Sequence, residues 1–267
     1  MKRNAILLIV VAAIVLIAVG LAVRKPAQEQ AATGKAGADL PVLKVGTDAA
    51  FPPFEFQDEK TGEIKGFDVD LITAIAQEMG MKAEIINTAW DGIIPGLLNG
   101  NYDVIASGMT ITDERAQSVD FSDPYFTAGL VIATLANNDS IKTPQDLAGK
   151  KVSVQINTTG DLFASKMKEL GEVKRFNLVP DAFLELKNGG VDACIMDLAV
   201  AKDFVKQDNS FKIVGNPITV EYYGFAIRKG REDLLKNINR ALATLKSTGK
   251  YDEIYAKYFE AAAEESK

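Results

Sequence analysis

The sequence predicts an α/β fold of two similar lobes with a ligand cleft between them. Segments with the apolar pattern of buried strands alternate with segments of helical spacing, which is typical of sheets covered by helices. One phrase also occurs twice, as "LLNGNYDVIASG" and as "LKNGGVDACIMD". Both copies end at residues unsuited to a core, in "SGMT" and at Asp197. Because ligands of open α/β sheets bind beyond the carboxyl ends of strands, two such ends would form a two-sided clamp.

The first lobe is expected to open with a buried strand and to continue with alternating helices and strands. Its helix "GFDVDLITAIAQEMG" has apolar residues at helical spacing and Gly80 as its C-terminal stop. The strand "PVLKVGTD" precedes this helix. The elements after it are the strand "KAEIINT", the short helix "WDGIIPGLLNG" and the strand "YDVIASG".

The second lobe repeats this alternation. Thr143 is a predicted N-cap, Pro144 the first helical residue and Gly149 a stop, so "KTPQDLAGKK" predicts a short helix. The elements after it are the strand "KVSVQI", a helix opening at "NTTGDLFASKMKEL", the helix "PDAFLELKNGG", the strand "VDACIMD" and the helix "LAVAKDFVKQ". After "EYYGFAI", two amphipathic helices joined at Gly249 complete the chain.

Composition excludes several classes of function. The net charge is -6 and the lysines lie scattered between acidic residues, which argues against nucleic-acid binding. The sequence contains no histidine, and its single cysteine, Cys194, lies in an apolar strand where a buried structural thiol is expected. Ser-His-Asp and Cys-His catalysis and ordinary zinc sites are therefore excluded, and we expect no metal, no cofactor and no enzymatic activity.

The N-terminus predicts export. Lys2 and Arg3 precede an uncharged apolar run, so residues 1–23 are expected to be a signal peptide or a membrane anchor. No cysteine follows the run, which excludes a lipoprotein anchor. Residues 24–40 have no periodicity and predict a flexible tether. We expect a periplasmic or otherwise extracytoplasmic protein, with the segment either cleaved or retained.

The strand ends offer one group for each charge of an α-amino acid. Arg115 can bind a carboxylate through two parallel hydrogen bonds, and the amides at Thr158 and Thr159 open a helix and add donors. On the other side, Asp197 and the acceptors around Ser107, Gly108 and Thr110 suit an ammonium group. A carboxylate and an ammonium on one carbon define the α-amino acid. The side chain would lie between Phe51 and Trp90, with Asp48 and Gln155 at its polar end.

Each of these residues also has an ordinary structural explanation. Arg115 could be a surface helix arginine, and the Asn-Gly repeat could be common turn chemistry. In the same way, the remaining residues could be helix N-caps (Asp48 and Asp197), a simple cap (Thr158 and Thr159) or core aromatics (Phe51 and Trp90). Convergence on the strand ends of both lobes favours the ligand site.

Several long motifs resemble the extracellular solute-binding proteins of family 3, which deliver polar amino acids to ABC transporters. The motifs include "VGTDAAFPPFEF", "SGMTITDERAQSVDFSDPYF", "DLAGKKVSVQINTTG" and "EYYGFAIRKG", and the similarity runs from about Leu43 to Phe259. The resemblance implies a periplasmic-binding-protein type II fold with a two-segment hinge at 127–131 and 221–225. Lobe 1 would then comprise 41–127 and 225–267, and lobe 2 would comprise 132–221.

The resemblance also implies roles for the site residues. Arg115 would hold the ligand carboxylate with Thr110 and the amides at Thr158 and Thr159, whereas Asp197 and Gly108 would hold the ammonium. The partners it implies are a free L-amino acid and a membrane permease, with the protein a monomer that closes on its ligand.

Two departures bear on the ligand. Thr159 stands where the family often has glycine, and Gln155 stands where some glutamine binders have a lysine that would repel a cation. Neutral Gln155 tolerates a cation, Asp48 stands at the far end, and "NTTG" and "EYYG" resemble arginine and lysine binders. A basic ligand, arginine or lysine, is therefore favoured, with glutamine as the alternative and histidine still open. Two rivals on the same fold are a dehydratase with Asp48 as general acid and a receptor sensor domain, although the chain ends soon after Phe259.

Overall fold

The computed structural model describes residues 40–260. The proposed signal or anchor at 1–23, nearly all of the proposed tether at 24–40, and the chain after residue 260 lie outside the described residues. Between residues 40 and 260, no helix has both the length and the apolar character needed to cross a bilayer.

The first sheet contains two parallel and two antiparallel strand pairs. Its strand order is β5 (Lys82–Asn87), β1 (Val42–Thr47), β6 (Val104–Ile105), β15 (Ala226–Arg228) and β7 (Val119–Phe121). β1 runs parallel to both β5 and β6, while β15 runs antiparallel to β6 and β7. The helices associated with this sheet are α2 (Phe67–Glu78), the 3-10 turn η1 (Trp90–Gly92), α3 (Ile93–Leu98), α4 (Asp113–Ala116), α8 (Glu232–Ser247) and α9 (Lys250–Phe259).

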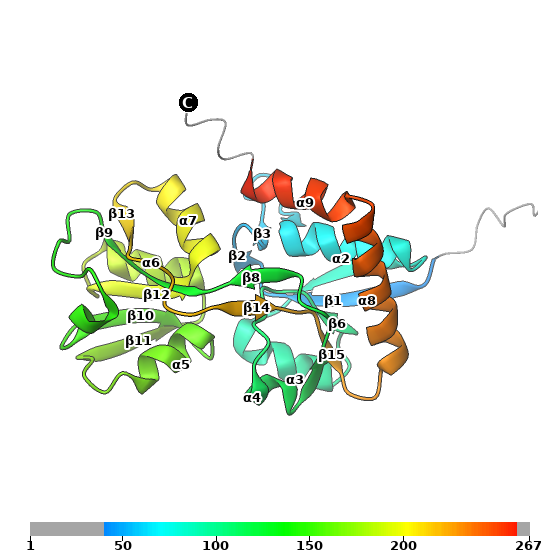
Figure 1. The fold of residues 1–267 in the computed structure, drawn as a ribbon, viewed down its shortest axis with the longest axis horizontal. Helices are drawn as coiled ribbons and strands as arrows, with labels where there is room; N and C mark the ends of the chain where they lie inside the picture. Colours follow the sequence, from blue (N-terminus) through cyan, green and yellow to red (C-terminus); the bar gives the residue numbers. More distant parts are fainter. Residues whose placement is uncertain (1–39, 261–267) are drawn as a thin grey trace, which may run out of the picture. The chain divides into compact units, whose positions relative to one another are not determined.

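The second sheet has the same sequence of parallel and antiparallel pairs. Its strand order is β11 (Glu172–Phe176), β10 (Lys151–Gln155), β12 (Ala193–Asp197), β9 (Leu130–Leu135) and β13 (Phe211–Val214). β10 is parallel to β11 and β12, and β9 is antiparallel to β12 and β13. Its helices are the 3-10 turn η2 (Pro144–Leu147), α5 (Thr159–Lys166), α6 (Val179–Lys187) and α7 (Leu198–Gln207). The two sheets, labelled in Figure 1, establish the two-lobed α/β architecture.

Two short strands connect the sheets. β8 (Phe126–Ala128) precedes β9, and β14 (Glu221–Tyr223) precedes β15; the two pair antiparallel with each other. Figure 1 shows them side by side between the lobes. Aromatic packing fixes this pair to the first lobe, because Phe54 contacts Phe126 and Tyr223 at ring-centroid distances of 4.8 and 5.2 Å.

The repeated phrase forms the same unit in each lobe, as predicted. In the first lobe α3 leads through a turn into β6, which pairs with β1; in the second α6 leads into β12, which pairs with β10. Each helix ends before a glycine in the left-handed region, at φ +80° for Gly100 and +72° for Gly189. The phrase therefore places a short central strand in each sheet.

Some elements differ from the sequence prediction. The strand expected over "YDVIASG" is only Val104–Ile105, and the helix capped by Thr143 is a 3-10 turn with a complete capping box. Three short antiparallel strands lie between β1 and α2, where the sequence analysis assigned no strand: β2 (Ala50–Phe51), β3 (Glu55–Gln57) and β4 (Ile64–Lys65). Strands of two or three residues are too short to show the alternation of apolar and polar residues that predicts a strand.

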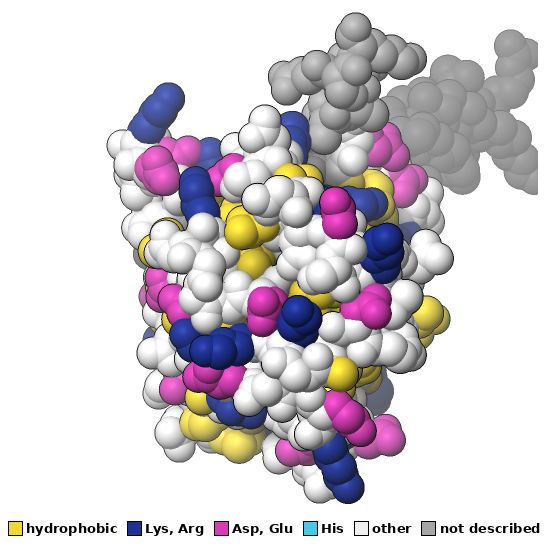
Figure 2. Space-filling view, turned by 90° about the vertical axis from the view of Figure 1, so that its left-hand side faces the viewer, with side chains coloured by type: hydrophobic (Ala, Val, Ile, Leu, Met, Phe, Trp, Pro, Cys, Tyr) yellow, Lys and Arg dark blue, Asp and Glu magenta, His cyan; other side chains and the backbone are white. Residues whose placement is uncertain are grey.

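The exposed charges are mixed in sign. On the face shown in Figure 2, which is the second-lobe end of the molecule, lysine and arginine side chains lie among aspartate and glutamate. Ion pairs within the second lobe include Lys187 with Asp208 at 2.6 Å and Lys174 with Glu185 at 2.6 Å. This face therefore offers no continuous basic surface of the kind that follows a phosphate backbone.

The turn at Gly189 can be tested with a matched pair of alanine substitutions. A Cβ added at Gly189 would meet no atom within 4 Å, so Gly189→Ala isolates the backbone strain at φ +72°. We expect a loss of about 1 kcal/mol in the free energy of unfolding, measured by urea denaturation. Gly92 is equally unobstructed but has φ -99°, so Gly92→Ala should leave stability unchanged or raise it by up to about 1 kcal/mol. Equal losses in both variants would contradict the conformational explanation.

Candidate ligand-binding site

One cavity lies where strands of both sheets end. The space between protein atoms there is about 320 Å³, part of which is open to solvent. Its lining residues are Asp48, Phe51, Glu55, Trp90, Ser107, Gly108, Thr110, Arg115, Gln155, Thr158, Thr159 and Asp197. The structure thus brings together every candidate site residue of the sequence analysis and adds Glu55.

The cavity follows from the equivalence of the two sheets. In the first, Asp48 follows β1, and Ser107 and Gly108 follow β6; in the second, Gln155 ends β10 and Asp197 ends β12. Parallel strands present their carboxyl ends at one edge of a sheet. These polar side chains are nevertheless buried, so each needs a partner in the protein or in a ligand.

Arg115 is held on the cavity side of α4. The hydroxyl of Thr112 caps this helix by accepting from the Arg115 amide at 3.2 Å. The guanidinium donates from Nη1 to the Thr110 carbonyl at 2.8 Å and from Nη2 to the Asn157 carbonyl at 3.3 Å, and it lies 5.1 Å from the Trp90 ring centre. Two of its five N–H groups are used in this way, and the others remain for an anion. Arg115 is therefore not an ordinary surface arginine.

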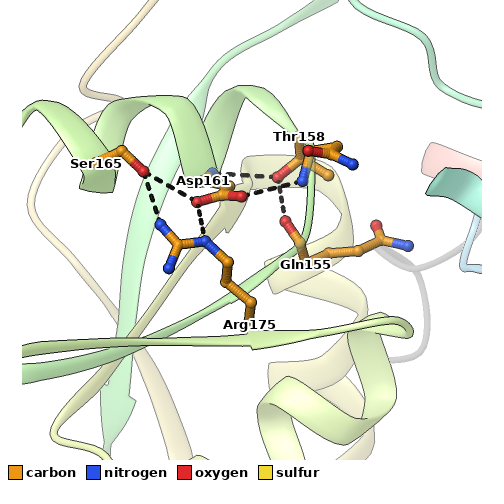
Figure 3. A network of polar contacts seen from close by, with 6 residues as sticks. Gln155, Thr158, Asp161, Ser165 and Arg175 are labelled. Carbon is orange, nitrogen blue, oxygen red and sulfur yellow. Dashed lines mark hydrogen bonds and ion pairs between the residues drawn. The ribbon is translucent and has the colours of Figure 1, made fainter.

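The N-terminus of α5 lies beside the same cavity. The Thr158 hydroxyl accepts from the Asp161 amide at 3.2 Å and donates to the Gln155 carbonyl at 2.8 Å, as Figure 3 shows. This hydroxyl is therefore committed to capping the helix. The Thr159 and Gly160 amides, the first two of the helix, have no carbonyl partner inside it, so they remain the donors for an anion.

Glu221, in the connecting strand β14, ties the threonines of the two lobes together. Its Oε2 accepts from the hydroxyls of Thr110 and Thr159, each at 2.9 Å, and its Oε1 accepts from Thr219 at 3.0 Å. The Thr110 and Thr159 hydroxyl protons are therefore engaged, which leaves lone pairs and backbone amides for a ligand. Sequence reasoning missed Glu221, because nothing in "EYYG" shows which side chains face it.

Asp197 is buried without a complete set of partners. It occupies the N-cap position of α7, but its side chain makes no capping bond, and its Oδ1 has no hydrogen-bond partner among the described residues. Burial and the neighbouring Glu221 carboxylate together raise the pKa of Asp197 to about 7, against the opposite effects of the nearby Tyr223 hydroxyl and of Arg115. Helix capping therefore does not explain this carboxylate, and its free oxygen suits an ammonium donor.

A second group of polar residues lines the other end of the cavity. Gln155 Nε2 crosses from β10 to donate to Asp48 Oδ2 at 2.9 Å and also donates to the Asn177 carbonyl at 2.9 Å. The Ser107 hydroxyl accepts from the Asp48 amide and donates to Glu55 Oε1, both at 2.9 Å. Burial raises the pKa of Asp48 to about 6, although the hydrogen bond from Gln155 lowers it. Asp48 precedes the short strand β2 rather than a helix, so it is not an N-cap.

Two further carboxyl groups belong to this end: Glu55, which lines the cavity, and Asp68, which lies behind it. Glu55 and Asp68 are fully buried, and each has one oxygen with no partner among the described residues. Burial raises the pKa of Glu55 well above its usual value, with repulsion from Asp68 adding to the effect, and burial raises the pKa of Asp68 to about 7. Asp68 accepts from the Gly108 amide at 2.8 Å and from the Tyr125 hydroxyl. Sequence reasoning missed both, because Glu55 lies in an apolar motif and Asp68 in a helix start.

The aromatic residues serve both packing and the cavity. Phe51 belongs to the core, stacks on Phe54 with ring centres 5.7 Å apart, and also lines the cavity. Gly108 has φ +49°, and a Cβ there would come within 2.6 Å of the Phe51 ring. Glycine is therefore required beside Phe51. Trp90 is half-buried and donates its indole N–H to the Asn157 carbonyl at 3.2 Å.

The buried carboxyl groups predict a pH-dependent stability of the ligand-free protein. Asp197 and Asp48 have folded-state pKa values of about 7 and about 6, against an ordinary value of 3.8. The folded state then binds more protons than the unfolded state, so the free energy of unfolding falls as the pH rises from about 4 to about 7. Asp197→Asn should flatten this slope and stabilise the ligand-free protein near pH 8 by up to about 4 kcal/mol.

The measurement is urea denaturation near pH 5 and near pH 8, after removal of any bound ligand by unfolding and refolding. Asp139→Asn provides the matched control, since the Asp139 side chain is 89% exposed and forms only a surface ion pair with Lys212. An unchanged slope in Asp197→Asn would show that this carboxyl group is ionised in the folded state.

Comparison with known proteins places this geometry in a family. Residues 43–261 match the family described as bacterial extracellular solute-binding proteins, family 3. A probable histidine-binding protein of Neisseria gonorrhoeae is 42% identical over 224 residues, covering 82% of this chain and 83% of that protein. The L-arginine-binding protein of Pseudomonas aeruginosa is 37% identical over 233 residues, covering 83% of this chain and 89% of its own length.

Solved structures give the same result. An ancestral arginine-binding protein, determined with arginine and also with glutamine, is 50% identical with a TM-score of 0.79 in both forms. It covers 83% of this chain, and the alignment spans 99% of the glutamine-bound and 100% of the arginine-bound chain. At this identity the likeness extends to the sequence as well as to the fold.

Proposed function

The chain belongs to family 3 of the bacterial extracellular solute-binding proteins, and on that premise we propose that it binds a basic amino acid, arginine or lysine, and delivers it to an ABC transporter permease. The curated relatives are amino-acid-binding proteins of transporters rather than enzymes. The observation that carries the choice of ligand is the charge of the cavity: three carboxyl groups line it, a fourth lies behind it, and one guanidinium opposes them.

The two ends of the cavity support one orientation of the proposed ligand. Its carboxylate lies against the free N–H groups of Arg115 and the first amides of α5, where both a formal charge and a helix dipole favour an anion. Its ammonium lies against Asp197, whose unpartnered oxygen then gains a charged donor. Ligand binding would lower the pKa of Asp197 and convert a destabilising buried acid into half of an ion pair.

The side chain then extends toward Asp48, Glu55 and Gln155. A guanidinium or ammonium there relieves the mutual repulsion of the carboxyl groups, whereas a neutral amide can only hydrogen bond to them. Glutamine remains the second candidate, because Gln155 and Asp48 also provide a donor and an acceptor for an amide. The ancestral relative that was solved with both arginine and glutamine supports keeping both ligands in the test.

Delivery requires the lobes to open and close. We expect motion about β8 and β14, which connect the two sheets, in keeping with a hinge at 127–131 and 221–225. The lobes would be 41–127 with 225–267, and 132–221. The contacts between Gln155 and Asp48 and between Arg115 and Asn157 join residues from different sheets, so opening would break them and release the ligand to the permease.

The primary test is calorimetry of the ligand-free protein with each of the twenty amino acids, followed by Arg115→Ala. We expect arginine or lysine to bind most tightly, and Arg115→Ala to lose about 2–5 kcal/mol of affinity because it leaves the ligand carboxylate unpaired in a buried site. Arg240→Ala is the control, since this exposed arginine on α8 bonds only to Asn237 on its own helix. Unchanged binding in Arg115→Ala would refute the assignment of the carboxylate subsite.

The preference for a cation is tested by Asp48→Asn, which keeps the shape of the side chain and removes its charge. We expect at least a tenfold loss of affinity for arginine and lysine, about 1.4 kcal/mol or more, and a smaller change for glutamine. Calorimetry with the three ligands gives the comparison. A larger loss for glutamine than for arginine would make glutamine the natural ligand.

A further inference from the structure

The turn between β10 and α5 presents a backbone carbonyl to the opposite lobe. Asn157 in this turn is the one non-glycine residue between positions 40 and 260 with a positive φ, +59°. Its carbonyl accepts from Trp90 Nε1 at 3.2 Å and from Arg115 Nη2 at 3.3 Å. Both donors belong to elements of the first lobe, whereas Asn157 belongs to the second. The Asn157 carbonyl oxygen therefore bonds across the cleft to two residues that line the cavity, Trp90 and Arg115.

A polar network outside the cavity holds this turn in its left-handed conformation. Asp161 Oδ2 accepts from the Asn157 amide at 3.1 Å, and Asp161 Oδ1 accepts from Arg175 Nε at 2.9 Å and from the Ser165 hydroxyl at 3.1 Å. Arg175 Nη2 also donates to the Ser165 hydroxyl at 2.9 Å, which closes the network seen in Figure 3. The Asn157 side chain is itself exposed, so packing of this side chain does not impose the positive φ.

We propose that Arg175, acting through Asp161, is a positioning residue that fixes the Asn157 carbonyl as the acceptor that orients Arg115 for the ligand carboxylate. Arg175 lies on the edge strand β11 and does not line the cavity, so it touches no ligand. Its fork-shaped guanidinium bonds Asp161 and Ser165 together, and this fixes the carboxylate to which the Asn157 amide donates. With the carbonyl in place, two N–H groups of Arg115 are directed to Thr110 and Asn157, which fixes the plane of its remaining donors.

The inference rests on the proposed function and adds a kinetic consequence. The Asn157 carbonyl reaches Arg115 only when the lobes are together, so it contributes after the ligand has entered. Loosening the turn should therefore speed dissociation and leave association nearly unchanged. A merely structural role for Arg175 would lower the stability of the second lobe without a selective effect on dissociation.

The experiment measures association and dissociation rates of radiolabelled arginine, by uptake and by chase with unlabelled arginine, in Arg175→Gln, Arg175→Lys and Lys174→Gln. We expect Arg175→Gln to raise the dissociation rate about 5- to 20-fold with association within about twofold of wild type. Arg175→Lys restores a charge but not the fork and should recover part of the effect. Lys174→Gln is the matched control on the same strand, because Lys174 pairs with Glu185 and has no contact with Asp161.

A double-mutant cycle tests whether Arg175 acts through the Asn157 carbonyl. Trp90→Phe removes the other N–H that donates to the Asn157 carbonyl, so the combined rise in dissociation rate with Arg175→Gln should be smaller than the product of the two single effects. Multiplicative effects, or an Arg175→Gln dissociation rate within twofold of wild type, would overturn the inference while leaving the proposed function intact. If the wild-type protein bound none of the twenty amino acids, the proposed function would fail first and the inference with it.

Discussion

Burial of carboxyl groups at the carboxyl ends of parallel strands is the constraint on which the cavity depends. Asp48 and Asp197 occupy such ends, one in each sheet; Glu55 lines the cavity beside the first, and Asp68 lies behind it. Removing these groups from water disfavours their charged forms, which is why their pKa values rise toward neutrality. A site with this composition is poorly satisfied by its own protein, and this is the physical basis of our proposal that a ligand carrying positive charge completes it.

The connecting strands determine how the two half-sites meet. The aromatic rings of Phe126 and Tyr223 pack on Phe54 in the first lobe, while the next residues of the same chain segments enter or leave the second sheet. Glu221 lies on one of these strands and accepts from threonines of both lobes. The cavity is therefore linked to the connecting strands by hydrogen bonds as well as by chain continuity. Displacement of one lobe changes the surroundings of Glu221, and its charge acts on both Arg115 and Asp197.

Much of the fold and of the candidate site was predictable, because strand ends are local features of the sequence. The two copies of the helix–turn–strand phrase identified the central strands of both sheets, and the polar residues just after them line the cavity. Glu55, Asn157 and Glu221 were not predictable from their own surroundings. Glu55 faces the cavity only because three short strands fold back at 50–65, and Glu221 matters only because two threonines far apart in the chain meet on it. Contacts of this kind are set by tertiary structure and leave no periodic trace.

The two copies of the repeated unit end differently, and this difference suits a zwitterion. After β6 the chain turns sharply at Gly108, with φ +49°, and reaches Arg115 by way of α4. β12 ends at Asp197, which is extended, and the chain continues directly into α7. A carboxylate therefore lies where the first copy has the turn at Gly108. The same scaffold therefore presents a cation from one lobe and an anion from the other. A ligand with both charges on one carbon can pair with both lobes at once. A simple anion or cation pairs with only one lobe and would stabilise a closed arrangement less.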